Sequence, residues 1–146
     1  MTDAGLNRRG YRGYVTSRPF MGERAPQHIQ NLVIRDYARR LGLSYLLSVS
    51  EYAMTGSQMI LDQVLDDLAD LDGIICYSIF QLPTRAERRR AVYARVLSAG
   101  RELHGAVEGL VLRDAADAAR IEDIWRVRQV LAACPSADAV REAANA

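Results

Sequence analysis

The 146-residue sequence predicts one α/β domain with three layers. Short apolar runs alternate with longer segments in which apolar residues recur every three or four positions, a pattern typical of parallel strands linked by helices. Hydrophobic residues make up 49% of the chain and charged residues 25%, the composition of a folded domain rather than a disordered one. We therefore expect a four-stranded, mainly parallel sheet in the order 2-1-3-4, with helices on both faces.

The first half of the chain predicts two strand–helix units. Tyr14 to Thr16 ends the first strand, and Pro26 is well placed to begin a helix that Gly42 ends. Tyr45 to Val49 favours the second strand. Ser57 is the expected N-cap of the second helix, because a serine hydroxyl accepts a hydrogen bond from a first-turn amide.

The second half continues the alternation. Gly73 to Phe80 predicts the third strand, and Thr84 with Glu87 forms a T-x-x-E capping box at the start of the third helix. Leu103 to Glu108 predicts the fourth strand, and its extension through Leu112 is left open.

Asp114 or Asp117 is expected to start a last helix. The predicted organisation is an N-terminal arm (1–12), a single α/β domain (13–134) and a flexible C-terminal tail (135–146).

Composition excludes several kinds of chemistry. All 19 basic residues are arginine, so there is no lysine for a Schiff base, a pyridoxal phosphate anchor or a P-loop. The two cysteines, Cys76 and Cys134, have no C-x-x-C spacing, and the two histidines are far apart. Neither a metal site nor a cofactor is therefore expected, and Cys76 within an apolar run is interpreted as a small buried hydrophobe.

Net charge and hydropathy indicate which binding partners and which cellular location to expect. The formal net charge of +1 argues against a nucleic-acid or membrane partner. The run Arg88-Arg89-Arg90 could touch nucleic acid, but a solvated helix face is favoured. No apolar stretch is long enough to span a bilayer and no secretory leader is seen, so a cytoplasmic location is expected.

Polar residues gather where the predicted strands end. The ends of parallel strands meet at one edge of a sheet, where ligands commonly bind. The polar residues at these ends are Ser17, Arg18, Glu51, Tyr52, Ser78, Gln81 and Glu108. Each alone is more often a loop hydrogen bond than a catalyst, but together they predict a site, placed between strands one and three.

The loop after the first strand is suited to an anion. Arg18 and Arg24 precede a helix N-terminus that starts near Gln27, and such an arrangement attracts phosphate or carboxylate. The alternative is that these arginines pair with nearby acids. No G-x-G-x-x-G pattern is present, so a phosphorylated sugar or nucleotide sugar is favoured over a dinucleotide.

The order of residues along the first three strands is similar to that of the catalytic domain of serine recombinases (resolvases). The matching residues are Tyr14, Ser17, Gln27 or Gln30, and Thr55-Gly56-Ser57. That resemblance implies a flavodoxin-like or resolvase-like sheet. After strand three the family has an Asp-Arg pair and further arginines that bind the scissile phosphate, whereas this chain has Gln81-Leu82-Pro83.

Longer segments resemble the sporadic carbohydrate cluster protein family. They are Gly13–Phe20, Pro26–Asn31, Ser50–Met54 and Tyr77–Pro83. The resemblance implies a place among surface-polysaccharide and sugar biosynthesis proteins.

Two functions follow as expectations. The first is an enzyme of a carbohydrate pathway that binds a phosphorylated sugar or nucleotide sugar at the ends of strands one and three. Its binding residues would be Ser17, Arg18, Arg24, Gln27, Tyr52, Ser57, Ser78 and Gln81, and its proton-transfer residues Glu51, His28 and Glu108. The second is a non-catalytic accessory subunit of another enzyme. A homodimer is expected in either case, because a small sheet leaves an edge or apolar face that monomers seldom expose.

Overall fold

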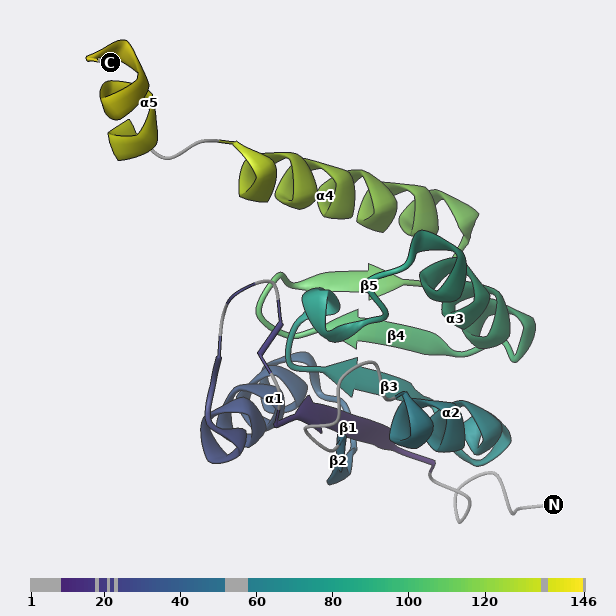
Figure 1. Ribbon diagram of the computed structural model, residues 1–146. Coiled ribbons are helices and arrows are strands. Elements are labelled where there is room, and N and C mark those ends of the chain that lie inside the picture. The colour runs from purple at the N-terminus through teal and green to yellow at the C-terminus, as the bar shows by residue number, and fades with distance from the viewer. Residues whose placement is uncertain are drawn as a thin grey trace, which may run out of the picture.

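The computed structural model describes residues 9–17, 19–20, 22, 24–51, 58–134 and 137–145. Within these residues, a five-stranded sheet has the order β2-β1-β3-β4-β5, with helices on both faces (Figure 1). The strands are β1 (Tyr11–Thr16), β2 (Tyr45–Glu51), β3 (Gly73–Cys76), β4 (Glu102–Gly105) and β5 (Leu110–Leu112). The helices are α1 (Gln27–Leu41), α2 (Met59–Asp66), α3 (Ala86–Ser98), α4 (Ala115–Ala133) and α5 (Ala137–Ala144), with short 3₁₀ turns η2 (Leu68–Asp70) and η3 (Ile79–Gln81).

The predicted α/β class and the order 2-1-3-4 are confirmed, and β5 is the addition. β1 is parallel to β2 and β3, β3 is parallel to β4, and β5 is antiparallel to β4. The chain reverses over 106–109, where Gly109 adopts a φ of 65° that favours glycine and its amide donates to the Gly105 carbonyl over 2.9 Å. The segment from Leu103 to Leu112, expected to hold a single strand, therefore forms a hairpin.

Two apolar cores separate the three layers. Alternate residues of a strand point to opposite faces, so neighbours Tyr14 and Val15 enter different cores. Val15 and Ile75 pack against Ile34 of α1 on one face. On the other face, α2, α3 and α4 cover a larger core. Its most buried members are Tyr14, Leu61, Ile74, Cys76, Ile79, Val96, Leu103, Leu112, Ile121 and Trp125.

Some helix ends lie where the sequence predicts them, and others do not. Gly42 ends α1 with a φ of 68°, and the Asp114 side chain caps α4 by accepting from the Asp117 amide, as predicted. The capping box predicted at Thr84 is wrong: α3 has Arg85 as its N-cap and no side-chain cap bond.

A capping box forms instead at the preceding 3₁₀ turn. Ser78, the N-cap of η3, accepts from the Phe80 amide, and the Gln81 side chain accepts from the Ser78 amide. The turn shortens the third strand to Gly73–Cys76. Burial raises the pKa of the Cys76 thiol to about 12, which agrees with its interpretation as a buried hydrophobe.

The C-terminal segment expected as a flexible tail contains α5, whose residues are all exposed. Since α5 buries none of its residues, the predicted domain boundary at 134 stays a prediction. Within the described residues, no helix combines the length and apolar character that a membrane crossing requires.

A buried hydrogen-bonded cluster lies between α1 and the start of β4. The Tyr37 hydroxyl is 2.6 Å from His104 Nδ1, and His104 Nε2 is 2.9 Å from Glu102 Oε1, which also accepts from the Tyr11 hydroxyl. A carboxylate only accepts, so Nε2 carries the imidazole proton and Nδ1 accepts from Tyr37. Burial lowers the pKa of His104 below its usual value, against the opposing effect of Glu102.

Stability should therefore fall on acidification through the titration of His104. A histidine with a lowered pKa in the folded chain binds its proton more tightly when unfolded, so its contribution is complete above the ordinary pKa of 6.5 and is lost as the pH falls below it. His104→Gln should flatten this part of the profile of unfolding free energy against pH, measured by urea denaturation from about pH 5 to 8. His28→Gln, at an exposed position of α1, is the matched control and should leave the profile unchanged.

Candidate functional site

The predicted site residues at the ends of the strands divide into described and undescribed ones. Arg18, Tyr52 and Ser57 lie outside the described residues. Ser17 is half-buried just after β1, and its hydroxyl donates to the Glu51 carbonyl oxygen over 3.1 Å.

Glu51, expected to transfer protons, is fully buried at the end of β2. Its carboxylate accepts from the Tyr14 hydroxyl over 2.9 Å and from the backbone amides of Ile60 and Leu61 over 3.1 Å each. These amides belong to the first turn of α2, which has no cap from its own N-cap side chain. Glu51 therefore ties β1 to the start of α2, and its proton-transfer role stays a prediction.

A buried amide network joins the ends of β1 and β3. Gln30 of α1 donates to the Thr16 carbonyl over 2.8 Å and accepts from the Thr16 amide over 3.2 Å. Gln81 Nε2 donates to Gln30 Oε1 over 2.7 Å and to the Thr16 hydroxyl over 3.1 Å. All three side chains are buried, so polar groups of this crevice are engaged with one another.

Ser78 and Glu108 are brought together at the border of this network. The Ser78 hydroxyl donates to Glu108 Oε2 over 2.7 Å, and the Ile79 amide donates to Oε1 over 2.9 Å. Ser78 is buried while Glu108 is half-buried. The contact holds the β4–β5 turn against η3.

The remaining predicted residues lie around the start of α1. Gln27 Oε1 accepts from the Ser50 hydroxyl over 3.2 Å, whereas Arg24 and His28 are exposed. Among the described residues, the hydrogen bonds of the amide network include neither Arg24 nor His28. Nor does the described part of the chain hold three His, Cys, Asp or Glu side chains arranged as a metal site.

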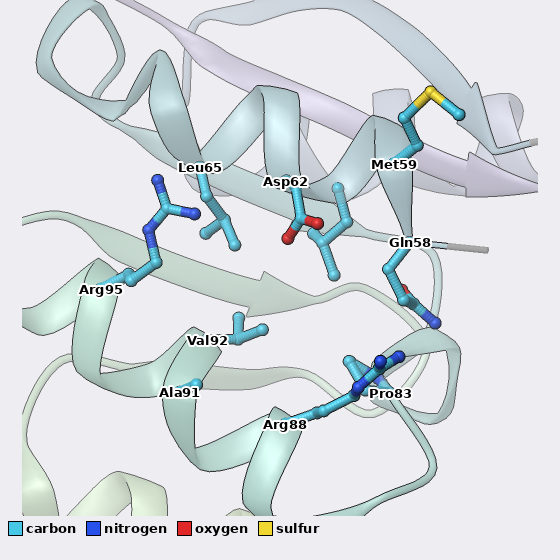
Figure 2. A pocket seen from close by; sticks show the side chains of 10 residues that line it. Gln58, Met59, Asp62, Leu65, Pro83, Arg88, Ala91, Val92 and Arg95 are labelled. Carbon is cyan, nitrogen blue, oxygen red and sulfur yellow. The ribbon is translucent and has the colours of Figure 1, made fainter. Parts of the chain in front are cut away.

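A groove that the sequence did not predict runs between α2 and α3, with a volume of about 480 Å³ (Figure 2). Apolar and polar residues both line its walls, and three charged side chains reach it. The lining residues are Gln58, Met59, Leu61, Asp62, Leu65, Pro83, Arg88, Ala91, Val92 and Arg95. Arg95 is ion-paired with Asp66, while neither Asp62 nor Arg88 has a side-chain partner among the described residues.

The groove continues into a smaller pocket of about 360 Å³ at the N-terminal end of α3. Gln58, Pro83, Thr84, Arg85 and Arg88 line it. The N-cap residue Arg85 makes no side-chain hydrogen bond to the amides in the first turn of α3. Thr84, Arg85 and Arg88 thus line a pocket beside the N-terminal end of α3, with room for an anion.

In the run Arg88-Arg89-Arg90, Arg88 and Arg90 are exposed, as expected of a solvated face, but Arg89 is not. Arg89 is buried, with its guanidinium over the Trp125 ring at 4.1 Å and bonded to Glu122. Arg90 is exposed and lines a different surface hollow, beside Glu122. Successive helical residues are rotated by about 100°, so three adjacent arginines serve three different surroundings. That rotation is the signal from which the groove position of Arg88 could have been inferred.

Comparisons with known proteins identify the fold. No family model matches the chain, and no curated protein does either. Among solved structures, the N-terminal catalytic domain of TP901-1 integrase matches with a TM-score of 0.50 and 12% sequence identity, over 82% of this chain and 95% of that domain. At this identity the likeness shows the fold alone, and it confirms the resolvase-like architecture.

Two expectations are corrected by this finding. The matching structure is an integrase catalytic domain, which conflicts with the carbohydrate, polysaccharide and nucleotide-sugar assignment and with the exclusion of nucleic acid. The resemblance to the sporadic carbohydrate cluster family finds no support, and the sugar ligand expected from it is withdrawn. The homodimer is not tested by a single chain.

The amide network should be energetically coupled. Gln30→Ala or Gln81→Ala alone leaves buried partners unsatisfied and should cost about 1–3 kcal/mol of unfolding free energy. The double variant should cost less than the sum, by about 0.5–3 kcal/mol, in a double-mutant cycle measured by urea denaturation. Gln129→Ala, at an exposed position of α4, should be neutral. Additive effects of the two buried substitutions would show that the network is not a unit.

Proposed function

We propose that this protein binds nucleic acid, and that Arg85 and Arg88 hold a backbone phosphate at the N-terminal end of α3. The observation that carries the proposal is the pocket that these arginines share with Thr84 and Gln58. Arginine suits this role because its planar guanidinium donates two parallel hydrogen bonds to phosphate oxygens.

The charges at the pocket favour an anion. Arg88 has no hydrogen-bond or ion-pair partner among the described residues. Arg85 lies 3.8 Å from Glu87, but both side chains are more than 70% exposed, at 74% and 78%, so this contact contributes little. The uncapped start of α3 adds a partial positive charge.

Arg89 keeps this pocket in shape. Its Nη1 donates to the carbonyl oxygens of Pro83 and Thr84, over 3.2 and 2.6 Å. These two residues line the pocket directly before α3. Arg89 is therefore a positioning residue, whereas Arg85 and Arg88 are the proposed contacts.

The likeness to an integrase catalytic domain supports the choice of nucleic acid among polyanions. The resemblance to serine recombinases implies an Asp-Arg pair and further arginines after strand three that contact phosphate. This chain has Gln81-Leu82-Pro83 in place of the pair, but Arg85 and Arg88 also follow β3. The proposal concerns binding. It assigns no catalytic role to Ser17, the residue after β1, whose hydroxyl donates to the Glu51 backbone carbonyl.

Arg88→Ala should weaken binding of short DNA strands about ten- to a hundredfold, because it removes a charge-assisted contact worth about 1.5–3 kcal/mol. The loss should be similar for every sequence, and the slope of log affinity against log salt should fall by about one unit. Fluorescence anisotropy with labelled DNA measures both quantities.

Arg90→Ala is the matched control, since Arg90 is exposed on the same helix but outside the pocket. Circular dichroism establishes that both variants remain folded. Equal losses for Arg88→Ala and Arg90→Ala would indicate diffuse attraction to α3 and would contradict the assigned pocket.

A further inference from the structure

The groove between α2 and α3 is continuous with the pocket proposed for phosphate. Gln58, Pro83 and Arg88 line both cavities, so a ligand held at Arg88 has direct access to the groove. Figure 2 shows Arg88 and Gln58 at one end and Asp62 farther along, with its carboxylate directed from α2 toward α3. Asp62 lies four residues after Gln58, which is about 6 Å along the helix.

The apolar part of the groove wall is suited to contact with the flat face of a nucleobase. Leu61, Leu65 and Met59 come from α2, and Ala91 and Val92 come from α3. A cavity of about 480 Å³ has room for one nucleobase, and the apolar walls would cover its faces.

Among the described residues, unpartnered polar groups of both kinds line the groove: the Arg88 guanidinium is a donor, and two other groups are acceptors. Gln58 Oε1 is buried and has no hydrogen-bond donor, and the Asp62 carboxylate has no partner among the described residues. A buried acceptor without a donor is costly, so a ligand that brings a donor gains at Gln58 Oε1, while the exposed Asp62 carboxylate offers two further acceptors. Arg95, at the far end, is already paired with Asp66.

From these contacts we infer that the groove receives one unpaired guanine, next to the phosphate held by Arg85 and Arg88. Guanine presents two adjacent N–H donors on its Watson–Crick edge, and these match the two oxygens of the Asp62 carboxylate. Thymine presents one N–H between two carbonyl groups, which a carboxylate repels. Because the Watson–Crick edge is covered in a duplex, the ligand is single-stranded nucleic acid.

The inference rests on the proposed function, and the experiment separates the two. Fluorescence anisotropy would compare a labelled oligothymidine with the same strand carrying one central guanine. The guanine strand should bind about tenfold more tightly to the full chain. Asp62→Asn should reduce this preference below about threefold, since a carboxamide no longer offers two acceptors. Oligothymidine should bind as tightly or more tightly, because the charge that repels the thymine carbonyls is removed.

Two further variants serve as references. Arg88→Ala should weaken both strands by the same factor, because it acts on the phosphate. Asp67→Asn, at the exposed end of α2 and outside the groove, should retain the guanine preference. Circular dichroism establishes that each variant is folded.

Each remaining outcome decides one of the two claims. Equal affinity for the two strands, or a preference that survives Asp62→Asn, overturns the guanine site and leaves the phosphate pocket in place. Displacement of the guanine strand by free 5′-GMP at equal concentration would assign the groove to a mononucleotide and overturn the single-strand assignment. Failure of the full chain to bind either strand overturns the proposed function together with the inference.

Discussion

The buried guanidinium of Arg89 fixes the part of the molecule in which the proposed sites lie. Only 3% of its side chain is exposed, and it donates to both carboxylate oxygens of Glu122, over 2.8 and 2.9 Å. Tyr93 donates to the same carboxylate, and burial raises the pKa of its hydroxyl, so it stays a donor. An uncompensated buried charge costs several kcal/mol, so α3, α4 and the loop at Pro83 are held as one unit. The position of Arg88 depends on that unit.

The same use of buried polar groups explains the other end of the sheet. Parallel sheets commonly bind ligands where their strands end, because neighbouring loops separate there. Here Gln30 and Gln81 occupy that space, and each bonds both to the other and to Thr16. Satisfied amides of this kind stabilise a unique arrangement of β1, α1 and η3. The groove between α2 and α3, in contrast, retains a buried acceptor without a donor at Gln58, so it is a region with unmet hydrogen-bonding capacity.

Local signals in the sequence predicted most of the fold. Gly42 and Asp114 end and begin helices as expected, because a left-handed glycine and an N-cap carboxylate act within a few residues. The hairpin after β4 and the absence of a cap at Thr84 depend on tertiary contacts. Arg89 bonds the Thr84 carbonyl and Glu122 of a distant helix, and the spacing of apolar residues along α3 does not predict these contacts.

The candidate site was harder to predict because it depends on pairs of helices. Strand ends are visible in a sequence, and polar residues such as Ser78 and Glu108 were correctly placed at the same edge. Their contacts with each other, however, depend on geometry that spacing does not encode. Asp62 and Arg88 lie on different helices and were brought to one groove by the packing of α2 against α3.

Net charge was a poor guide to nucleic acid because it sums over paired and unpaired groups. Arg39 and Arg40 both bond Asp36, and Arg89 is neutralised internally by Glu122. A total of +1 therefore reveals little about potential at a given place. At the start of α3, Arg88 lacks a partner and the helix dipole adds to its charge. In the function proposed here, one such pocket is enough to bind a phosphate without a broad basic surface, and the acceptors of the adjoining groove would add the specificity that charge alone does not supply.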